Sequence, residues 1–473
     1  MNQRTRTIIK DFFYSTASNL MGAVISALLV LIVPKFIPVD QYGYWQMAVF
    51  YFSYIGFFHF GWADGAYLRY GGAIYGELDK GLFKNQFFAL VAFEFLLGIG
   101  IFGSALLLPL SGAKKYIFGA FAIGCVLQLP GSFLRLMLQA TGRIKEYSQN
   151  ILVDKGSYGV LICLLLILGV RSYRLLILAD ILTRFASTAH AAYLCRDILL
   201  SKETCTPQTT FLEARENIKA GSKLLFANLT SMLIIGIVRF GIEHSWDVST
   251  FGKVSLTLSI SNFAMIFVSA VSMIAFPLLK RTKQENWAKI YHTMNTTMMI
   301  PIVGILLFFF PLRWILMKWL PAYYDSLKFM AILFPMCLYE GKNTLLINTY
   351  LKALRKEKVL LYSNVASVII SLGLTLTFTV FTKNLEMAVL SIVVVLAFRC
   401  SASEIVLSRY LKVNVMKSIV LEFLCSCVFI YSASMIESGL VGFGLYLVVY
   451  LIYVGLNFKE LKESVGMIKN ISH

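Results

Sequence analysis

Basic side chains recur inside segments of this sequence that are otherwise apolar. Arg184 lies about ten residues, roughly 15 Å, inside the apolar stretch that starts near residue 174, which places it close to the middle of that stretch. The others lie nearer one end of their segments: Arg135, Lys155, Arg239, Lys342 and Arg399. A cation at the centre of a membrane-spanning helix costs about 2.5 to 3.5 kcal/mol on insertion scales, so it is expected to face a wet cavity or a partner. Together these residues predict a cationic interior.

Each of these residues also has a structural interpretation. Asp180 precedes Arg184 by four residues, and Glu243 follows Arg239 by four, so each pair can be neutralised on one helical face.

Three of the other cations can extend to a membrane surface instead. Arg135 and Arg399 lie within about two helical turns of a predicted end, and Lys155 directly follows Asp154.

Arg135 belongs to a polar seam. Gln128, Arg135 and Gln139 are spaced at i, i+7 and i+11, which places all three on one stripe of an α-helix. A polar stripe on an apolar helix is expected to face the interior of a bundle. We therefore predict that Gln128 and Gln139 bind substrate together with the cations Arg135, Arg184, Arg239, Lys342 and Arg399.

Carboxylates inside apolar segments are candidates for ion coupling, because a carboxylate in a low-dielectric site can titrate near neutral pH or bind Na⁺. The four candidates are Glu94, Asp180, Glu340 and Glu404. Glu94 has no base nearby in sequence and could instead be a lone polar residue facing another helix. Glu404 lies near a predicted cytoplasmic end, where water could solvate it.

Glu340 and Lys342 are two residues apart and therefore point to nearly opposite faces of a helix. At least one of them must have a different partner.

The elements that position these residues are membrane-spanning helices. Of the 473 residues, 58% are hydrophobic and only 14% are charged, and the mean hydropathy is +0.73. Soluble domains have a charged fraction of about 25%. The apolar runs, of about 20 residues, are long enough to cross a bilayer. The chain is predicted to be an all-α polytopic membrane protein with about fourteen transmembrane helices. These predicted spans are 16–36, 43–62, 86–109, 117–139, 149–170, 174–195, 221–242, 253–278, 293–316, 326–349, 359–381, 385–406, 414–435 and 438–457.

Two short patterns occur twice along the chain. Asn19-Leu20 and the following VDQYG at 39–43 recur 209 positions later as Asn228-Leu229 and VSTFG at 248–252. Ala140, Arg143 and Lys145 recur 213 positions later as Ala353, Lys356 and Lys358. The offset maps the first predicted span onto the seventh, so the chain is expected to contain two parallel six-helix repeats followed by two C-terminal helices.

The expected domains follow from these repeats. They are an N-terminal lobe at 1–200, a cytoplasmic linker at 201–218, a C-terminal lobe at 219–410, and two additional helices with a cytoplasmic tail at 411–473.

Charge on the loops predicts the orientation. The N-terminus and the even-numbered loops carry most of the loop Lys and Arg residues, which are retained on the cytoplasmic side. Both termini are therefore expected in the cytoplasm. The net charge of +18 follows largely from this topology and from anionic headgroups, so no nucleic-acid partner is expected.

Neither an enzyme nor a cofactor is expected. Gly341-Lys342-Asn343 lacks the first glycine of a phosphate-binding loop, and the eight cysteines show no metal-ligand spacing. The five histidines do not cluster in sequence, and His190, the one best placed inside a helix, is expected to be packed or hydrogen-bonded.

Four further stretches carry a resemblance to a known family. They are VDQYG at 39–43, GWADGAYLRYGG at 61–72, LQATGRIKEYS at 138–148 and WLPAYYDSL at 319–327. With these stretches the chain resembles the oligosaccharide repeat-unit flippases of O-antigen, capsule and exopolysaccharide biosynthesis. That family belongs to the multidrug/oligosaccharidyl-lipid/polysaccharide exporter superfamily.

The resemblance implies a function, a membrane and partners. Such flippases move an undecaprenyl-pyrophosphate-linked oligosaccharide from the cytoplasmic to the outer leaflet of the bacterial inner membrane by alternating access between two lobes. A cationic cavity suits the pyrophosphate, because Arg forms charge-assisted and often bidentate bonds with phosphate oxygens. Without a nucleotide site, the energy would come from an H⁺ or Na⁺ gradient or from consumption of the product outside. The expected partners are membrane lipid, a polysaccharide polymerase and a chain-length regulator, and the expected oligomeric state is a monomer.

Two other functions stay open. An ion-coupled multidrug or small-molecule antiporter would share the fold but would need acidic residues for cationic drugs, and the excess of internal Arg disfavours it. An integral-membrane polysaccharide polymerase or acyltransferase would be expected to have a large external loop or a catalytic His within the membrane, and the predicted external loops are short.

Overall fold

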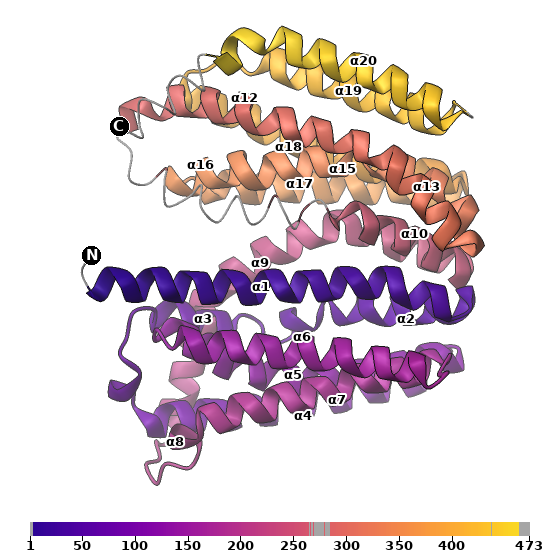
Figure 1. The fold of residues 1–473 in the computed structure, drawn as a ribbon. Helices are drawn as coiled ribbons and strands as arrows, with labels where there is room; N and C mark the ends of the chain where they lie inside the picture. The colour runs from indigo at the N-terminus through magenta and orange to yellow at the C-terminus, as the bar shows by residue number, and fades with distance from the viewer. Residues whose placement is uncertain are drawn as a thin grey trace. The chain divides into compact units, whose positions relative to one another are not determined.

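The chain is almost entirely helical. A computed structural model describes residues 3–263, 265, 268, 279, 284–436 and 438–462, with side chains from residue 13 onward except that of residue 284. These residues form helices and no strands (Figure 1). They divide into two compact units, Met1–Leu229 and Thr230–His473.

Eleven of the described helices are long and apolar enough to cross a membrane, which makes the chain a multi-pass integral membrane protein. The eleven segments are Phe13–Phe36, Lys80–Leu107, Gly112–Ala140, Ile144–Ile167, Tyr173–Leu194, Pro207–Ser245, Trp287–Trp319, Glu357–Phe381, Leu385–Leu411, Met416–Ser434 and Gly439–Leu456. Each coincides with one of the predicted spans.

The three remaining predicted spans are not single helices in the described structure. The span predicted at 43–62 is broken between α2 (Val39–Phe52) and α3 (Trp62–Arg69), where Phe60 and Gly61 have φ of 51° and 90°. The span predicted at 326–349 is a series of short helices: α14 (Leu327–Leu333), α15 (Met336–Lys342), the π-helix η6 (Asn343–Ile347) and α16 (Asn348–Ala353). The span predicted at 253–278 begins in α10 (Val248–Ser261), and most of its second half lies outside the described residues.

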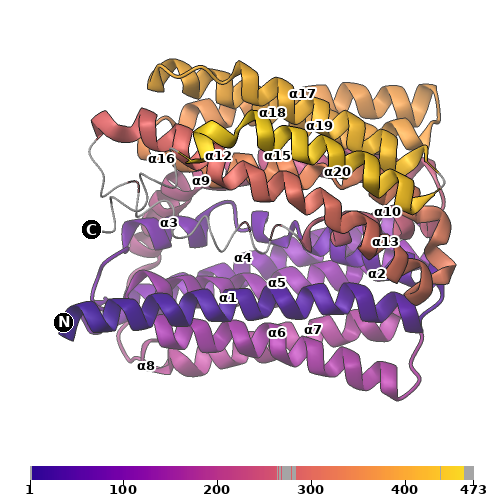
Figure 2. The ribbon, with the colours of Figure 1, turned by 45° about the horizontal axis from the view of Figure 1, so that its top comes forward.

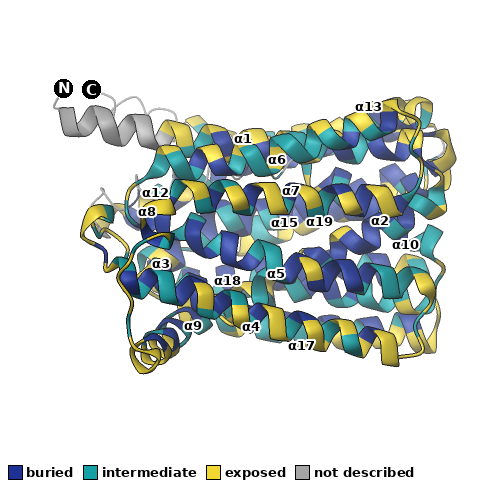
Figure 3. Cartoon of the chain, turned by 90° about the horizontal axis from the view of Figure 1, so that it is seen from below, coloured by how far each residue is buried: buried dark blue, intermediate teal, exposed yellow. Residues whose placement is uncertain are grey.

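Unit 1 packs its helices around α5 (Gly112–Ala140). This helix contacts α4 (Lys80–Leu107), α7 (Tyr173–Leu194), α6 (Ile144–Ile167) and α3, and α1 (Gln3–Phe36) packs against α6. In its most apolar stretch 67% of α5 is buried, compared with 22% of α4 (Figure 3). The exposed side chains of the outer helices are large and apolar, such as Leu96 and Ile167. Such a surface suits contact with lipid.

Unit 2 is organised around α18 (Leu385–Leu411). This helix packs against α14, α15 and α17 (Glu357–Thr375), while α19 (Met416–Ser434) pairs with α20 (Gly439–Leu456) (Figure 2). The remaining elements of this unit are α12 (Trp287–Ile305), α13 (Phe309–Trp319), the π-helix η7 (Leu376–Phe381), and the 3-10 helices η3 (Gln284–Asn286), η4 (Leu306–Phe308) and η5 (Pro321–Ser326). The remaining elements of unit 1 are the 3-10 helices η1 (Ile55–Phe57) and η2 (Tyr75–Glu77), and α8 (Arg196–Leu199).

The first repeated sequence pattern marks an equivalent helix start in the two units. α2 begins at Val39 and α10 begins at Val248, which is the predicted offset of 209, and each helix has 14 residues. Tyr42 and Phe251, which occupy matching positions, are both buried. The duplication predicted from the sequence therefore has a structural counterpart.

The second repeated pattern marks an equivalent turn. α5 ends at Ala140 and α16 ends at Ala353; two residues later, Gly142 and Arg355 have φ of 76° and 54°. The next amide in each turn donates to a carbonyl five residues back, from Arg143 to Leu138 at 2.9 Å and from Lys356 to Leu351 at 2.8 Å. Both turns are left-handed helix caps of the same kind.

Hydrogen bonds between loops of unit 1 place these loops at two ends. At one end the amide of Gly72 donates to the carbonyl of Ala140 at 2.9 Å. At the other end the Tyr116 hydroxyl donates to the carbonyl of Arg174 at 2.9 Å. The loops therefore alternate between ends as the sequence predicts, with the basic even-numbered loops together.

The GWADGAYLRYGG stretch packs against α9 (Pro207–Ser245), the helix in which the boundary between the two units falls. A Cβ atom at Gly65 would lie 1.7 Å from the carbonyl oxygen of Asn217, and one at Gly221 would lie 2.0 Å from the carbonyl oxygen of Gly61. Only glycine permits backbones to approach this closely. The glycines of this stretch therefore have a packing role.

Side-chain hydrogen bonds also join this stretch to α9. Arg69 donates to Glu213 and to Asn217, both at 2.6 Å, and the Tyr70 hydroxyl donates to Glu213 at 2.7 Å. Burial, with the neighbouring Glu213 carboxylate, raises the pKa of Tyr70, so its hydroxyl remains a donor at neutral pH.

We predict that Gly65→Ala destabilises the protein by about 1–3 kcal/mol, because the added methyl group must displace the α9 backbone. The thermal midpoint of the protein purified in detergent measures this effect. Gly100→Ala on α4 is the matched control, since nothing lies within 4 Å of a Cβ atom there. Equal midpoints for the two variants would contradict the proposed backbone contact.

Candidate functional site

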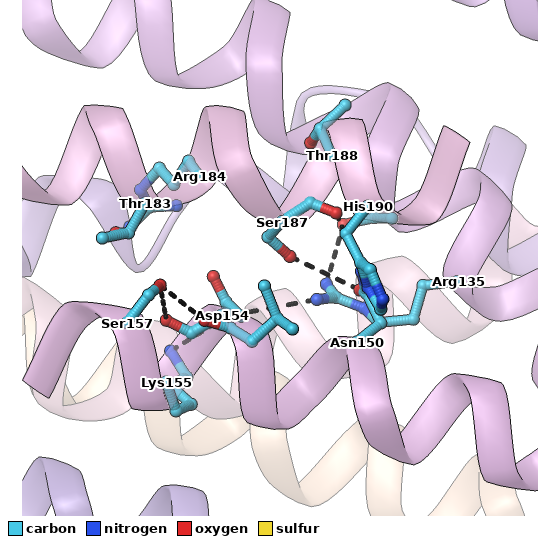
Figure 4. A network of polar contacts seen from close by, with 12 residues as sticks. Arg135, Asn150, Asp154, Lys155, Ser157, Thr183, Arg184, Ser187, Thr188 and His190 are labelled. Carbon is cyan, nitrogen blue, oxygen red and sulfur yellow. Dashed lines mark hydrogen bonds and ion pairs between the residues drawn. The ribbon is translucent and has the colours of Figure 1, made fainter. Parts of the chain in front are cut away.

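Two helices of unit 1 bring a cationic cluster together. Arg135 lies on α5, and Asp154 and Lys155 lie near the middle of α6, which packs between α1 and α7 (Figure 4). We call Arg135, Asp154 and Lys155 the cationic cluster.

Two cations share one carboxylate in the cationic cluster. Asp154 Oδ2 lies 4.0 Å from Arg135 Nη1 and 3.6 Å from Lys155 Nζ, and Arg135 Nη2 donates to Ser132 Oγ at 3.1 Å. The side chains of Arg135 and Lys155 are 21% and 46% exposed within the described structure. Among the described residues, this cluster therefore has two cations and one carboxylate, a formal charge of +1.

Neighbouring polar contacts hold α6 against α7. The buried Asn150 side chain donates to the carbonyl of Ser187 at 2.8 Å and lies 3.3 Å from His190 Nδ1. His190 is thus a hydrogen-bonded side chain, as expected from the sequence. The stem of Lys155 packs beside α1, where a Cβ atom on Gly22 would lie 3.1 Å from Lys155 Cγ. These contacts position the cationic cluster.

The predicted binding residue Arg184 is neutralised on its own helix. Its Nε donates to Asp180 Oδ2 at 2.8 Å, and its guanidinium lies 5.1 Å from the ring centroid of Phe52. This is the local pairing that the four-residue spacing allows. Asp180, predicted to couple an ion, is engaged in the same pair.

The predicted polar seam is present on α5. Gln128, Arg135 and Gln139 are all half-buried, whereas most of their helix is buried. Gln128 Oε1 is inaccessible to solvent and has no hydrogen-bond partner among the described residues.

Glu94 lies alone on α4. Its side chain is fully buried, and neither carboxylate oxygen has a hydrogen-bond partner within the described part of the chain. Burying a carboxyl group without a hydrogen-bond partner is costly.

Unit 2 contains a second cluster, centred on Lys342. The fully buried Lys342 Nζ lies 2.7 Å from Glu404 Oε2 and donates to both oxygens of Glu422, at 2.8 and 2.9 Å. Ser418 Oγ accepts from Lys342 at 3.2 Å, and the Tyr291 hydroxyl donates to Glu404 Oε1 at 2.8 Å. We call these five residues the acidic cluster. The structure places Glu404 in this buried cluster, rather than in water at the cytoplasmic end.

Glu340 and Arg399 form a separate pair. Arg399 Nη2 lies 2.6 Å from Glu340 Oε2, and Arg399 Nη1 donates to Ser231 Oγ at 3.2 Å. Glu340 and Lys342 therefore have different partners, as their two-residue spacing predicts. Arg399 is buried, so it does not extend to the membrane surface.

Arg239 lies elsewhere in unit 2. It donates to Ser255 Oγ at 3.0 Å, and its guanidinium lies 5.3 Å from the ring centroid of Phe251. Within unit 2, the contacts of Arg239 are separate from those of the acidic cluster and of the Glu340–Arg399 pair.

The sequence analysis missed Glu422 and Tyr291. Glu422 is the one acidic residue between Met416 and Ser434, so its position in an apolar helix was as clear a signal as that of Glu404. It was overlooked because the last two helices were treated as an addition to the repeats. In the structure α19 supplies a carboxylate to the interior of unit 2.

We predict that Lys342→Ala destabilises the protein by about 3–5 kcal/mol, because two buried carboxylates lose their cation. Lys155→Ala is the comparison; Lys155 is about half exposed and should contribute less than about 1 kcal/mol. Thermal unfolding in detergent measures both effects. A Lys342→Ala protein as stable as the wild type would contradict the buried contacts.

No protein-family model matches this sequence, and no curated protein matches it. Solved structures do match its fold. A lipid II flippase, MurJ, in an inward closed conformation matches with a TM-score of 0.66 and 13% identity, over 94% of this chain and 99% of that chain. An inward-facing multidrug resistance MATE family transporter of the MOP superfamily matches with a TM-score of 0.59 and 12% identity, over 90% of this chain and 96% of that chain.

A MOP superfamily transporter from Pyrococcus furiosus matches with a TM-score of 0.50 and 11% identity, over 86% of this chain and 97% of that chain. At these identities the similarity shows the fold alone. The chain thus has the two-repeat helical fold of these transporters, which confirms the predicted fold class.

Proposed function

We propose that this protein is a flippase for a lipid-linked oligosaccharide. Its substrate is an undecaprenyl-pyrophosphate-linked repeat unit, which it moves from the cytoplasmic to the outer leaflet of a bacterial inner membrane. The product would enter O-antigen, capsule or exopolysaccharide synthesis. The protein acts as a transporter and catalyses no covalent step.

The cationic cluster carries this proposal. A pyrophosphate is a compact anion, and a guanidinium and an ammonium side by side can each donate to its oxygens. Arg135 and Lys155 already attract one carboxylate between them, at 4.0 and 3.6 Å, and together with it carry a formal charge of +1. The binding of an anionic headgroup would satisfy that charge within the membrane, where an unpaired cation is costly.

The fold supports the same proposal. One neighbour is a lipid II flippase, so this architecture is compatible with moving a lipid-linked headgroup across a membrane. The exposed apolar side chains of the outer helices suit a lipid tail that stays in the bilayer while the headgroup passes. We propose that the protein alternates between inward-open and outward-open states as a monomer, with both termini in the cytoplasm. A polymerase and a chain-length regulator would use its product.

A multidrug antiporter is the second candidate. The fold is also that of a MATE transporter, and the two carboxylates of the acidic cluster are the kind of group that a cationic drug would require. Both carboxylates are buried and face Lys342, however, while the cationic cluster in unit 1 has a formal charge of +1. The electrostatics favour an anionic substrate.

The experiment is binding of undecaprenyl pyrophosphate to the purified protein in detergent. Arg135→Ala should weaken binding about tenfold to a hundredfold, since a hydrogen bond to a charged group contributes about 1.5–3 kcal/mol. The matched control is the double variant Asp180→Asn with Arg184→Gln, which removes an internally neutral pair from α7 and should bind nearly as the wild type does.

Two results would oppose the proposal. Equal binding of undecaprenyl pyrophosphate by the wild type and by Arg135→Ala would show that the cationic cluster is not the headgroup site. Tighter binding of a lipophilic cation such as tetraphenylphosphonium than of undecaprenyl pyrophosphate would favour the antiporter instead.

A further inference from the structure

The carboxylate of the cationic cluster is held by charge alone. Asp154 Oδ2 lies 4.0 Å from Arg135 Nη1 and 3.6 Å from Lys155 Nζ, and both distances exceed that of an N–H···O hydrogen bond. The nearby Ser157 hydroxyl donates to the backbone carbonyls of Val153 and Asp154 instead of to the carboxylate. Within the described part of the chain, the Asp154 side chain therefore has two cations beside it and accepts no hydrogen bond.

Other internal ion pairs of this protein are tighter. Arg184 Nε donates to Asp180 Oδ2 at 2.8 Å, and Arg399 Nη2 lies 2.6 Å from Glu340 Oε2. Charge-assisted hydrogen bonds of this length are about twice as strong as neutral ones. Asp154 has no such bond to lose, so moving its carboxylate away from the two cations costs less than separating either of those pairs.

The two cations are fixed more firmly than the carboxylate between them. Arg135 Nη2 donates to Ser132 Oγ at 3.1 Å, and the stem of Lys155 packs beside Gly22 of α1. The Asp154 side chain is 22% exposed, so water can solvate it when it turns away. Figure 4 shows that ion-pair contacts from Arg135 and Lys155 converge on Asp154. An anion that bridges both cations must take the position of this carboxylate.

We propose that Asp154 is an exchangeable counter-ion for Arg135 and Lys155. Its carboxylate neutralises part of their charge while the site is empty, and the pyrophosphate of the lipid-linked headgroup displaces it. The inference rests on the proposed function for the identity of the anion, and it adds how the site releases its substrate. When the headgroup leaves, Asp154 returns, so the two cations are not left unpaired inside the membrane.

The charges favour this exchange. Asp154 supplies one negative charge to two cations, which leaves the formal charge of +1. A pyrophosphate group carries at least two negative charges, and its oxygens can accept from the guanidinium and the ammonium at once. Displacement of Asp154 by pyrophosphate therefore compensates both cations. The return of Asp154 opposes the binding of the headgroup and thereby promotes its release.

The variant Asp154→Asn tests the proposal, because it removes the competing charge and keeps the shape of the side chain. Binding of undecaprenyl pyrophosphate to the purified variant in detergent should be about threefold to tenfold tighter than to the wild type, since a partly exposed ion pair contributes little more than an exposed one. If Asp154 only held the fold together, its loss would weaken binding. Unchanged or weaker binding by folded Asp154→Asn would overturn the proposal.

Asp197→Asn is the matched control. It removes the same charge from another ion pair of unit 1, in which Asp197 Oδ2 lies 3.6 Å from Lys80 Nζ. This variant should bind undecaprenyl pyrophosphate as the wild type does. Equal tightening in Asp197→Asn and Asp154→Asn would show that net charge, and not the position of Asp154, determines the affinity, and would overturn the proposal.

A second pair of variants covers the case in which Asp154→Asn does not fold, since that variant leaves two cations without a carboxylate. Lys155→Gln keeps Arg135 with Asp154, whereas Lys155→Gln combined with Asp154→Asn keeps Arg135 alone. The double variant should bind undecaprenyl pyrophosphate more tightly than Lys155→Gln, because no carboxylate competes for the guanidinium. Equal affinities of these two proteins would overturn the proposal.

Transport rates measure the role of Asp154 in release. In proteoliposomes that contain a fluorescent undecaprenyl-pyrophosphate-linked saccharide, Asp154→Asn should lower both the KM and the maximal rate of flipping, because the headgroup leaves the cations more slowly. Asp154→Glu, which keeps the charge, should return both values toward those of the wild type. A lower maximal rate with an unchanged or higher KM would indicate a structural defect and contradict the counter-ion role.

Inorganic pyrophosphate separates this inference from the proposed function. If the wild type does not bind undecaprenyl pyrophosphate, the flippase proposal is refuted, yet tighter binding of inorganic pyrophosphate by Asp154→Asn than by the wild type would still support the counter-ion role. If the wild type binds the lipid and both proteins bind inorganic pyrophosphate equally, the counter-ion role is refuted and the flippase proposal stands.

Discussion

An ionised side chain inside a membrane must be compensated, and the polar structure of this protein follows from that constraint. Insertion of an unpaired charge costs several kcal/mol, so each internal cation is expected to have an anion, an aromatic ring, a hydroxyl group or water beside it. Arg184 has Asp180, Arg399 has Glu340, and Lys342 has Glu404 and Glu422. Where compensation is incomplete, the remaining charge indicates which ligand could complete it.

The two units share their geometry and differ in this residual charge. The equivalent helix starts at Val39 and Val248, and the equivalent left-handed turns at Gly142 and Arg355, show a common framework. On this framework, unit 1 has two cations around one carboxylate, while unit 2 has two carboxylates around one ammonium. An excess of positive charge suits an anionic headgroup. The two halves of the duplicated fold therefore differ in the charge of their interior contacts.

Much of the fold could be predicted from the sequence, because hydropathy and helix length are properties of contiguous residues. The same holds for the repeat register and for the separation of Glu340 from Lys342, which depends only on helical geometry. Local spacing also identified the Asp180–Arg184 pair. The breaks at Gly61 and around the π-helix η6 were not predicted, because both segments are apolar enough overall to resemble continuous spans and their irregular backbone depends on packing.

The site was harder to predict, because its contacts join residues far apart in sequence. Lys342 meets Glu404 and Glu422 across three helices, and nothing in the local pattern of any one helix indicates the other two. Whether the internal cations converge likewise depends on packing between helices, which no local sequence pattern encodes. Arg135 lies on one helical stripe with Gln128 and Gln139, as their spacing indicates, whereas the contact of both Arg135 and Lys155 with Asp154 was not expected.

The most direct test of the central claim is the leaflet position of the lipid-linked oligosaccharide in cells that lack this protein. Accessibility to an external glycan-modifying enzyme assigns the leaflet. We expect complete oligosaccharide units to accumulate on the cytoplasmic leaflet, where the enzyme cannot reach them, and to become accessible when the wild-type protein is restored. Units that reach the outer leaflet at the normal rate without the protein, or a lipid-linked pool that does not change, would contradict the flippase account.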